Sequence, residues 1–134
     1  MKKNISSTLI ILSLALALAY GCRSAKNNRS AESFDAFYER FLTDSSFQME
    51  RIKFPLPGVK SGEEEDSTYQ WTRGEWIMLK KPELEGTDFK RNLEVSDSLA
   101  TDEIFMENAG FYFKTVYEPI KKKWYLVYMV DSGL

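Results

Sequence analysis

The chain has 134 residues, with 18 basic and 20 acidic side chains, one cysteine and no histidine. The missing histidine removes the commonest general base, the Ser/His/Asp and Cys/His catalytic arrangements, and the usual zinc ligand. The charges are nearly balanced and form no sustained basic face, which argues against nucleic acid as a partner.

The first segment has the pattern of an export signal. Residues 1–4 are basic, and the apolar run at residues 9–20 is shorter than the roughly 20 residues that span a bilayer. The run ends in Ala19-Tyr20-Gly21-Cys22, which resembles the lipobox of bacterial lipoproteins. This resemblance implies cleavage after Gly21 and acylation of Cys22, which would tether the chain to a membrane. The alternative is a soluble secreted protein in which Cys22 is incidental.

The chain then divides into three segments: a lipoprotein signal peptide at 1–21, a polar tether at 22–30 and a single α+β domain at 31–134. With its only cysteine used for lipidation, the mature chain has no disulfide. Its stability must therefore come from one modest hydrophobic core.

The first predicted element of the domain is an amphipathic helix over residues 33–42. Its apolar side chains recur at helical spacing: Phe34, Phe37, Tyr38, Phe41 and Leu42. Ser30 or Ser33 supplies the N-cap, and residues 43–46 end the helix. Such an aromatic stripe could hold a cofactor, but packing against a sheet explains it more simply.

Strands are expected over most of the remaining chain. Residues 47–54 alternate as a strand does, and Pro55-Leu56-Pro57-Gly58 ends that strand. Residues 69–73 and 75–79 read as strand segments broken at Gly74, whereas 83–99 can hold a short helix, a strand or both. Residues 102–109 lead into a β-hairpin of two aromatic and β-branched strands, 111–117 and 124–130, joined by a six-residue connection.

These motifs resemble a family of Bacteroidetes lipoproteins of unknown function. The resemblance rests on Asp44…Phe47-Gln48-x-x-Arg51-Ile52-x-Phe54-Pro55-Leu56, on a later tryptophan-bearing strand and on Lys123-Trp124-Tyr125-Leu126. It implies the fold of the nuclear-transport-factor-2-like and cystatin-like superfamily, in which an N-terminal helix packs on a curved antiparallel β-sheet. It carries no known activity. No acidic residues stand directly after Cys22, so the resemblance also implies an outer-membrane lipoprotein that faces the periplasm.

The hairpin strands are apolar on both faces. One predicted face carries Phe111, Phe113, Thr115, Tyr117, Trp124, Leu126, Tyr128 and Val130, and the other carries Tyr112, Val116, Tyr125, Val127 and Met129. The helix covers only one face, so the other is predicted to contact a second copy or an envelope protein. The alternative is that loops from residues 83–109 fold over it.

Two function classes remain open. The first is a ligand- or protein-binding module, and the second is an enzyme that uses carboxylates and tyrosines in the cone pocket. The missing histidine and the lack of any catalytic spacing favour the first, so no catalytic residue is predicted. The residues predicted for a pocket or interface are Trp71, Trp76, Tyr112, Tyr125, Val127 and Met129.

We expect the charged residues to have structural roles. The acidic run at 62–66 lacks the alternating ligands of a calcium loop, so no metal or cofactor is predicted. Glu50, Arg51 and Arg73 are expected to form ion pairs or to lie on exposed faces. Residues 121–123, three lysines at the hairpin end, are expected to keep that end soluble. The alternative is that they dock on the phosphates of a membrane surface.

Overall fold

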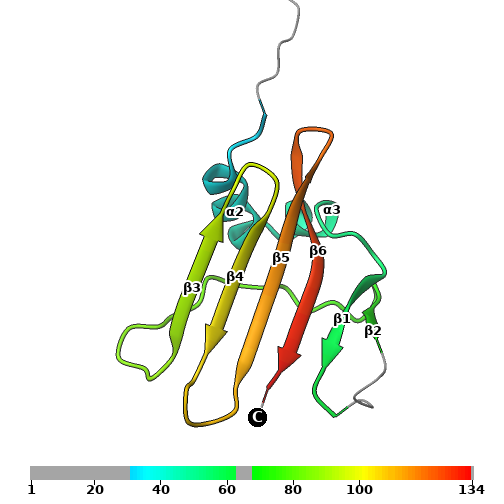
Figure 1. Cartoon of the computed structure of the whole chain (residues 1–134). Coiled ribbons are helices and arrows are strands. Elements are labelled where there is room, and N and C mark those ends of the chain that lie inside the picture. Colours follow the sequence, from blue (N-terminus) through cyan, green and yellow to red (C-terminus); the bar gives the residue numbers. More distant parts are fainter. Residues whose placement is uncertain (1–30, 63–67, 134) are drawn as a thin grey trace, which may run out of the picture.

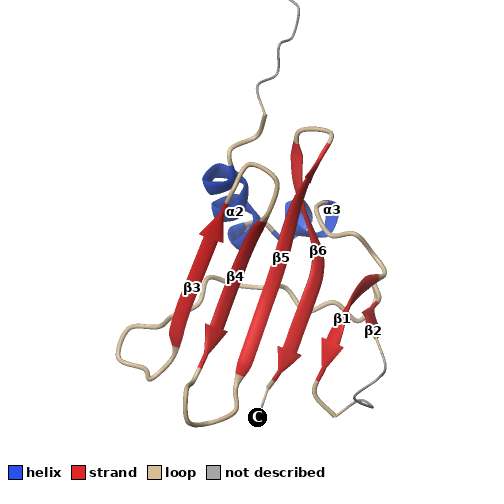
Figure 2. Cartoon of the chain, viewed as in Figure 1, coloured by secondary structure: helices blue, strands red, loops and turns tan. Residues whose placement is uncertain are grey.

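The computed structural model describes residues 31–62 and 68–133, where two helices lie on one face of a six-stranded sheet (Figures 1 and 2). The elements are α2 (Phe34–Thr43), α3 (Ser45–Glu50), β1 (Leu56–Lys60), β2 (Tyr69–Trp71), β3 (Lys90–Val95), β4 (Ala100–Phe105), β5 (Tyr112–Ile120) and β6 (Lys123–Ser132). The strand order is β2-β1-β6-β5-β4-β3, and of these pairs only β1–β6 is parallel. The predicted α+β class is confirmed. Cys22 and the tether lie outside the described residues.

Helix α2 confirms the predicted amphipathic helix. The Ser33 side chain caps it by accepting a hydrogen bond from the backbone N–H of Ala36 (3.2 Å). Four apolar side chains of the helix are buried: Phe34, Phe37, Phe41 and Leu42. Each such burial contributes about 1.5–3 kcal/mol. The apolar stripe of the helix thus packs into the core.

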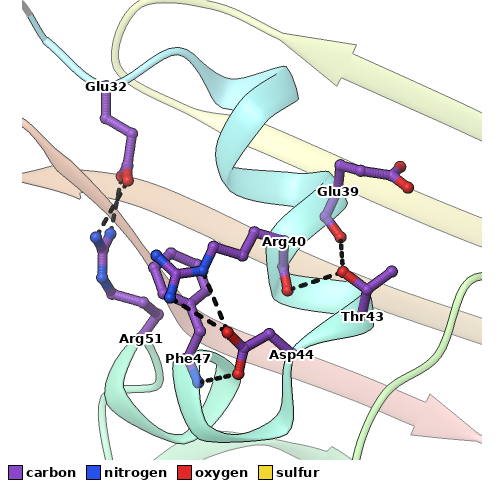
Figure 3. A network of polar contacts seen from close by, with 7 residues as sticks. All are labelled: Glu32, Glu39, Arg40, Thr43, Asp44, Phe47 and Arg51. Carbon is purple, nitrogen blue, oxygen red and sulfur yellow. Dashed lines mark hydrogen bonds and ion pairs between the residues drawn. The ribbon is translucent and has the colours of Figure 1, made fainter.

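The predicted strand over residues 47–54 is wrong, because its first half belongs to helix α3. The Asp44 carboxylate accepts a hydrogen bond from the backbone N–H of Phe47 (3.0 Å) and caps the new helix directly after α2 (Figure 3). Phe47 and Gln48 are buried by this turn of helix. Of the predicted strand, Ile52 forms only an isolated bridge to β6.

The predicted break at residues 55–58 is also wrong, because β1 begins at Leu56 and contains Pro57 and Gly58. The parallel pairing of β1 with β6 starts only at Gly58, so Pro57 precedes that ladder. A Cβ atom at Gly58 would lie 1.7 Å from the carbonyl oxygen of Met129. Glycine therefore permits the close approach of the two strands.

The predicted hairpin is present but longer than expected. β5 and β6 are joined by Lys121 and Lys122 alone, whose φ angles of 50° and 68° are those of a two-residue turn of the hairpin type. The predicted six-residue connection is therefore wrong. Pro119 is tolerated within β5 because the pairing of β5 with β4 ends at Tyr117, so one side of Pro119 has no neighbouring strand.

A bulge in β6 changes which side chains face the helices. Val116 pairs with Tyr128, but Tyr117 pairs with Leu126, so Val127 is an extra residue. The simple alternation expected along this strand is therefore shifted by one residue after Val127.

This shift corrects the predicted faces of the hairpin. Trp124 and Leu126 lie in the core as expected, but Met129 joins them there and is 4% exposed. Tyr128 and Val130 are only half-buried and lie on the face away from the helices. The alternation read from the sequence therefore placed Tyr128, Met129 and Val130 on the wrong faces.

The remaining segments also differ in part from prediction. β2 (Tyr69–Trp71) confirms the first part of the strand predicted at residues 69–73. Residues 75–79 form no strand and run as an irregular segment on the helix side of the sheet, where Leu79 bonds to Gln48. Residues 90–105 extend the sheet as β3 and β4, so the alternative that 83–109 fold over its second face is wrong (Figure 2).

Candidate ligand-binding pocket

A half-open cavity of about 430 Å³ lies between β1, β2, the end of β6 and the irregular segment 75–79. Its apolar walls come from both sides of this gap: Trp71, Trp76, Ile77, Met78, Leu79, Phe113 and Met129. Its polar groups gather on one side: Lys60, Tyr69, Glu75 and Asp131. This volume and composition are those of a small-molecule site.

Gln48 holds the irregular segment in place and so forms the wall of the cavity. Its side-chain oxygen accepts hydrogen bonds from Trp76 Nε1 (3.0 Å) and from the backbone N–H of Leu79 (2.9 Å). Its side-chain nitrogen donates to the carbonyl oxygens of Leu79 (2.9 Å) and Phe41 (2.6 Å). Gln48 is fully buried, and its side chain makes these hydrogen bonds inside the fold. They hold residues 76–79 in place of the backbone hydrogen bonds that a strand would make.

The polar side of the cavity is organised around Glu75. Its carboxylate accepts hydrogen bonds from the hydroxyls of Tyr69 (2.6 Å) and Thr72 (3.0 Å). The bond from Tyr69, followed by that from Thr72, holds the pKa of Glu75 below its ordinary value. Lys60 Nζ donates to the Tyr69 hydroxyl (3.3 Å) and lies 4.5 Å from the centre of its ring. The site thus places a cation and a carboxylate beside an aromatic wall.

The structure separates the predicted site residues into two groups. Trp71, Trp76 and Met129 line the cavity, although Met129 reaches it through the bulge rather than through the predicted alternation. Tyr112 and Tyr125 are half-buried on the other face of the sheet, and Val127 is the bulged residue between Leu126 and Tyr128. The six residues therefore do not form one site.

Tyr112 and Tyr125 have partners of their own. The Tyr112 hydroxyl donates to Glu103 (2.7 Å), and burial together with this bond raises its pKa to about 12. Lys53 Nζ lies 4.4 Å from the centre of the Tyr125 ring. Both tyrosines are therefore held within the fold.

The charged residues singled out from the sequence have structural roles. Arg51 forms an ion pair with Glu32, and the Arg73 guanidinium lies 5.1 Å from the centre of the Phe54 ring. Glu50 is exposed at the end of α3. None of the three lines the cavity.

A second polar cluster, between α2 and the sheet, was missed by sequence reasoning. Asp102 accepts hydrogen bonds from Tyr38 and from Arg91 Nε (2.7 Å) and Nη2 (3.1 Å). Burial is the main cause that raises the pKa of Tyr38, and the fully buried Tyr117 shows the same effect. Neither β3 (KRNLEV) nor β4 (ATDEIF) alternates polar with apolar residues, so no local pattern in the sequence signals this pairing.

The enzymatic alternative needs a tyrosine and a carboxylate at a cavity. They meet in two places: Tyr69 with Glu75 at the larger cavity, and Tyr38 with Asp102 in this cluster. The cavity beside it measures about 30 Å³, room for about one water molecule. Both oxygens of Asp102 already accept hydrogen bonds, and its side chain is 5% exposed. The cluster joins helix to sheet and is closed to a substrate.

Among residues 31–62 and 68–133, no group of three or more candidate ligands is placed to hold a metal ion. In the same part of the chain, no helix has the length and apolar character needed to cross a bilayer.

Comparisons with known proteins support the fold. A protein from Bacteroides uniformis, solved by NMR, is 26% identical, with 76% of this chain and 78% of that chain covered and a TM-score of 0.56. A cystatin-like protein from Bacteroides caccae is 24% identical, with 78% of each chain covered and a TM-score of 0.59. An NTF2-like protein from Bacteroides fragilis is 19% identical with a TM-score of 0.56; 78% of this chain matches 49% of that one.

Two further comparisons complete this picture. A protein-family model matches residues 32–132, about three quarters of the chain. Its description has only the form "-like" and names no activity. A search of curated proteins found no match.

Proposed function

Because this chain belongs to a family of unknown function with an NTF2-like and cystatin-like fold, we propose that it is a membrane-tethered binding module of the cell envelope. In this proposal the acylated Cys22 anchors the chain in the outer membrane, and the domain faces the periplasm. The cavity beside Trp71 and Trp76 binds a small amphipathic ligand or peptide side chain.

The cavity is the observation that carries the binding role. Two indole rings and Met129 offer an apolar wall, while Lys60 and Glu75 offer charges of both signs at one side. Ile77, which lines the cavity, is 84% exposed, so this part of the apolar wall is open to a ligand. A ligand that covered Ile77 would remove this surface from water and contribute about 25 cal/mol per Å² of buried area.

The binding role is tested with an aromatic anionic probe, anilinonaphthalene sulfonate, titrated against the protein by fluorescence. We expect saturable binding that Ile77→Ser weakens several-fold, because the variant removes apolar wall without removing a hydrogen bond. Leu99→Ser is the matched control, since Leu99 is 42% exposed and does not line this cavity. Binding that does not saturate, or that both variants change equally, would refute the site.

The anchor is tested separately at Cys22. Cys22→Ser should block processing, because the thiol that carries the lipid is lost, so the chain should keep residues 1–21 and carry no acyl group. Mass spectrometry of the mature N-terminus should show an acylated cysteine. An unmodified Cys22, or cleavage at another position, would contradict the anchor and leave the cavity proposal intact.

A further inference from the structure

The charged groups that line the cavity of about 430 Å³ are more acidic than basic. They are one ammonium group, on Lys60, and two carboxylates, on Glu75 and Asp131. Arg73 precedes Glu75 closely in the sequence, but its guanidinium packs over the Phe54 ring and does not line the cavity. Among the described residues, one positive and two negative groups therefore leave the lining with an excess of one negative charge.

The ammonium group of Lys60 is held within the wall. Its Nζ atom donates to the Tyr69 hydroxyl (3.3 Å) and lies 4.5 Å from the centre of that ring. The pKa of Glu75 is lowered first by the hydrogen bond from Tyr69 and, to a smaller extent, by the charge of Lys60. Lys60 thus helps to keep Glu75 ionised.

The second carboxylate, on Asp131, has no partner for its side chain. Asp131 pairs with Lys60 across β6 and β1, and its backbone carbonyl oxygen accepts a hydrogen bond from the N–H of Ser61 (2.7 Å). Its side chain is half-buried and makes no hydrogen bond or ion pair within residues 31–62 and 68–133. Such a carboxylate gives up part of its hydration without compensation. A cationic ligand would supply the missing partner.

The aromatic part of the lining also suits a cation. The rings of Trp71, Trp76 and Tyr69 line the cavity. Aromatic rings attract ammonium groups, and tryptophan does so most strongly. A contact of this kind is already present in the wall, where Lys60 lies over Tyr69. Beside these rings, the exposed Ile77 offers apolar surface for the body of a ligand.

The size of the cavity limits what it can take. A volume of about 430 Å³ is near the lower end of the roughly 300–1,000 Å³ of small-molecule pockets. The cavity therefore has room for a small molecule or a single side chain. Because it is half-open, a charged group at its mouth keeps part of its hydration.

We propose that this cavity binds an organic ammonium ion, a primary amine with a short aromatic or alkyl body. The inference rests on the proposed binding role of the cavity and names the class of its ligand. The ammonium group pairs with Asp131 and Glu75, and the body packs against Trp76 and Ile77. An anionic ligand of the same size would meet two carboxylates at the same place.

The test compares three small probes of similar shape and different charge: phenethylammonium, 2-phenylethanol and 3-phenylpropionate. Each is titrated into the full chain at pH 7 and its binding is measured by calorimetry. We expect the cation to bind several-fold more tightly than the alcohol, and the anion to bind most weakly. Added salt should narrow the difference between the charged probes, because it screens their interaction with the carboxylates.

A fourth probe, Nα-acetyllysine methylamide, separates two sources of the same chemistry. If it binds as tightly as phenethylammonium, the ammonium group belongs to a lysine side chain of a peptide. Weaker binding assigns the site to a free amine, and both results uphold the ligand class.

Two variants and a control locate the charge preference. Asp131→Asn and Glu75→Gln should each reduce the ratio of cation to alcohol affinity several-fold. Asp131→Asn removes no hydrogen bond of the fold, so we expect this variant to fold normally. Asp88→Asn is the matched control, because Asp88 is exposed in the loop before β3 and does not line the cavity. Equal binding of cation and anion, or a preference that all three variants leave unchanged, would overturn the inference.

This test is separate from the titration with anilinonaphthalene sulfonate. That probe carries its charge on a large ring system, so its binding reports the apolar wall of the cavity. If it saturates but the cation is not preferred, the binding role stands and the ligand class is wrong. If neither that probe nor any of the smaller ones binds, the binding role and this inference both fail.

Discussion

Glu32 and Arg51 form a two-point ion pair that ties the entry of the chain to α3, with Nη1–Oε2 and Nη2–Oε1 distances of 2.8 and 3.1 Å (Figure 3). The Arg51 side chain is 11% exposed and the Glu32 side chain 24%. Arg51 also donates to the carbonyl oxygen of Trp124 (3.1 Å) and lies 4.5 Å from the centre of the Phe47 ring. One guanidinium thus joins the chain entry, the short helix and β6.

Arg51→Met should therefore lower the free energy of unfolding by about 3 kcal/mol, because it leaves a partly buried carboxylate without its partner. Arg40→Met is the matched control: Arg40 also lies over Phe47, but its ion pair with Asp44 is exposed. We expect that control to cost less than about 1 kcal/mol. Urea unfolding of both variants measures the difference, and equal losses would contradict a special role for Arg51.

The same pair makes stability depend on pH. Burial alone would raise the pKa of Glu32, but hydrogen bonds from Arg51 and Trp124 hold it below 4.5. Its contribution is therefore complete above about pH 4.5 and is lost as the pH falls through the lowered value. Glu32→Gln should destabilise the protein at pH 7 and differ less from the wild type at pH 3. Urea unfolding at both pH values checks this, and a constant difference would be the contrary result.

The sequence predicted the fold class and helix α2 because their determinants are local. The stripe from Phe34 to Leu42 and the cap at Ser33 lie within one helix, and the aromatic runs at the chain end mark a hairpin. The second helix was missed because Phe47 and Ile52 also fit a strand. What decided the conformation was the Asp44 cap together with the buried bonds of Gln48 to a segment 31 residues away.

The candidate site was predicted only in part, for a similar reason. Trp71 and Trp76 were found on the predicted strand segments 69–73 and 75–79, but a single bulge at Val127 moved Met129 to the other face. No local pattern announces such a bulge, since β-branched and aromatic residues suit both faces of a strand. The wall of the cavity depends on tertiary bonds from Gln48, which periodicity does not report.

Gly58 should tolerate no side chain. A Cβ atom there would lie 1.7 Å from the Met129 carbonyl oxygen and 2.7 Å from the Trp71 ring. Gly58→Ala would force β1 away from β6 and should cost about 3 kcal/mol or more. Gly74→Ala is the control, because nothing lies within 4 Å of its Cβ position. Thermal unfolding that moved equally in both variants would refute the close approach.

Gln48 should be essential to the cavity wall. Gln48→Leu keeps much of the volume but leaves the Leu79 backbone and the Trp76 indole without their partners, which we expect to cost about 2–3 kcal/mol. The probe should also bind several-fold more weakly, because the segment that carries Ile77 is released. Gln70→Leu, at an exposed position of β2, should change neither property. Urea unfolding and the probe titration measure the two effects, and unchanged probe binding in Gln48→Leu would contradict this role.

The last prediction concerns the sheet face that the helices do not cover. Val116, Tyr128 and Val130 lie there half-buried, and residues 83–109 extend the sheet instead of covering them. We therefore still expect this face to contact a second copy of the chain, and the non-acylated domain, expressed without residues 1–22, to sediment as a dimer at micromolar concentration.

A single charge on this face should separate the copies without unfolding them. Val130→Glu places a carboxylate opposite Lys114, its partner across β5 and β6, so the sheet itself tolerates the change. Ile77→Glu is the control, because Ile77 is 84% exposed and lies on the irregular segment at the helix side of the sheet. Sedimentation velocity should show a monomer for the first variant and a dimer for the second. A wild-type chain that stays monomeric at tens of micromolar would contradict the homodimer. Its half-buried apolar face would then remain in contact with solvent.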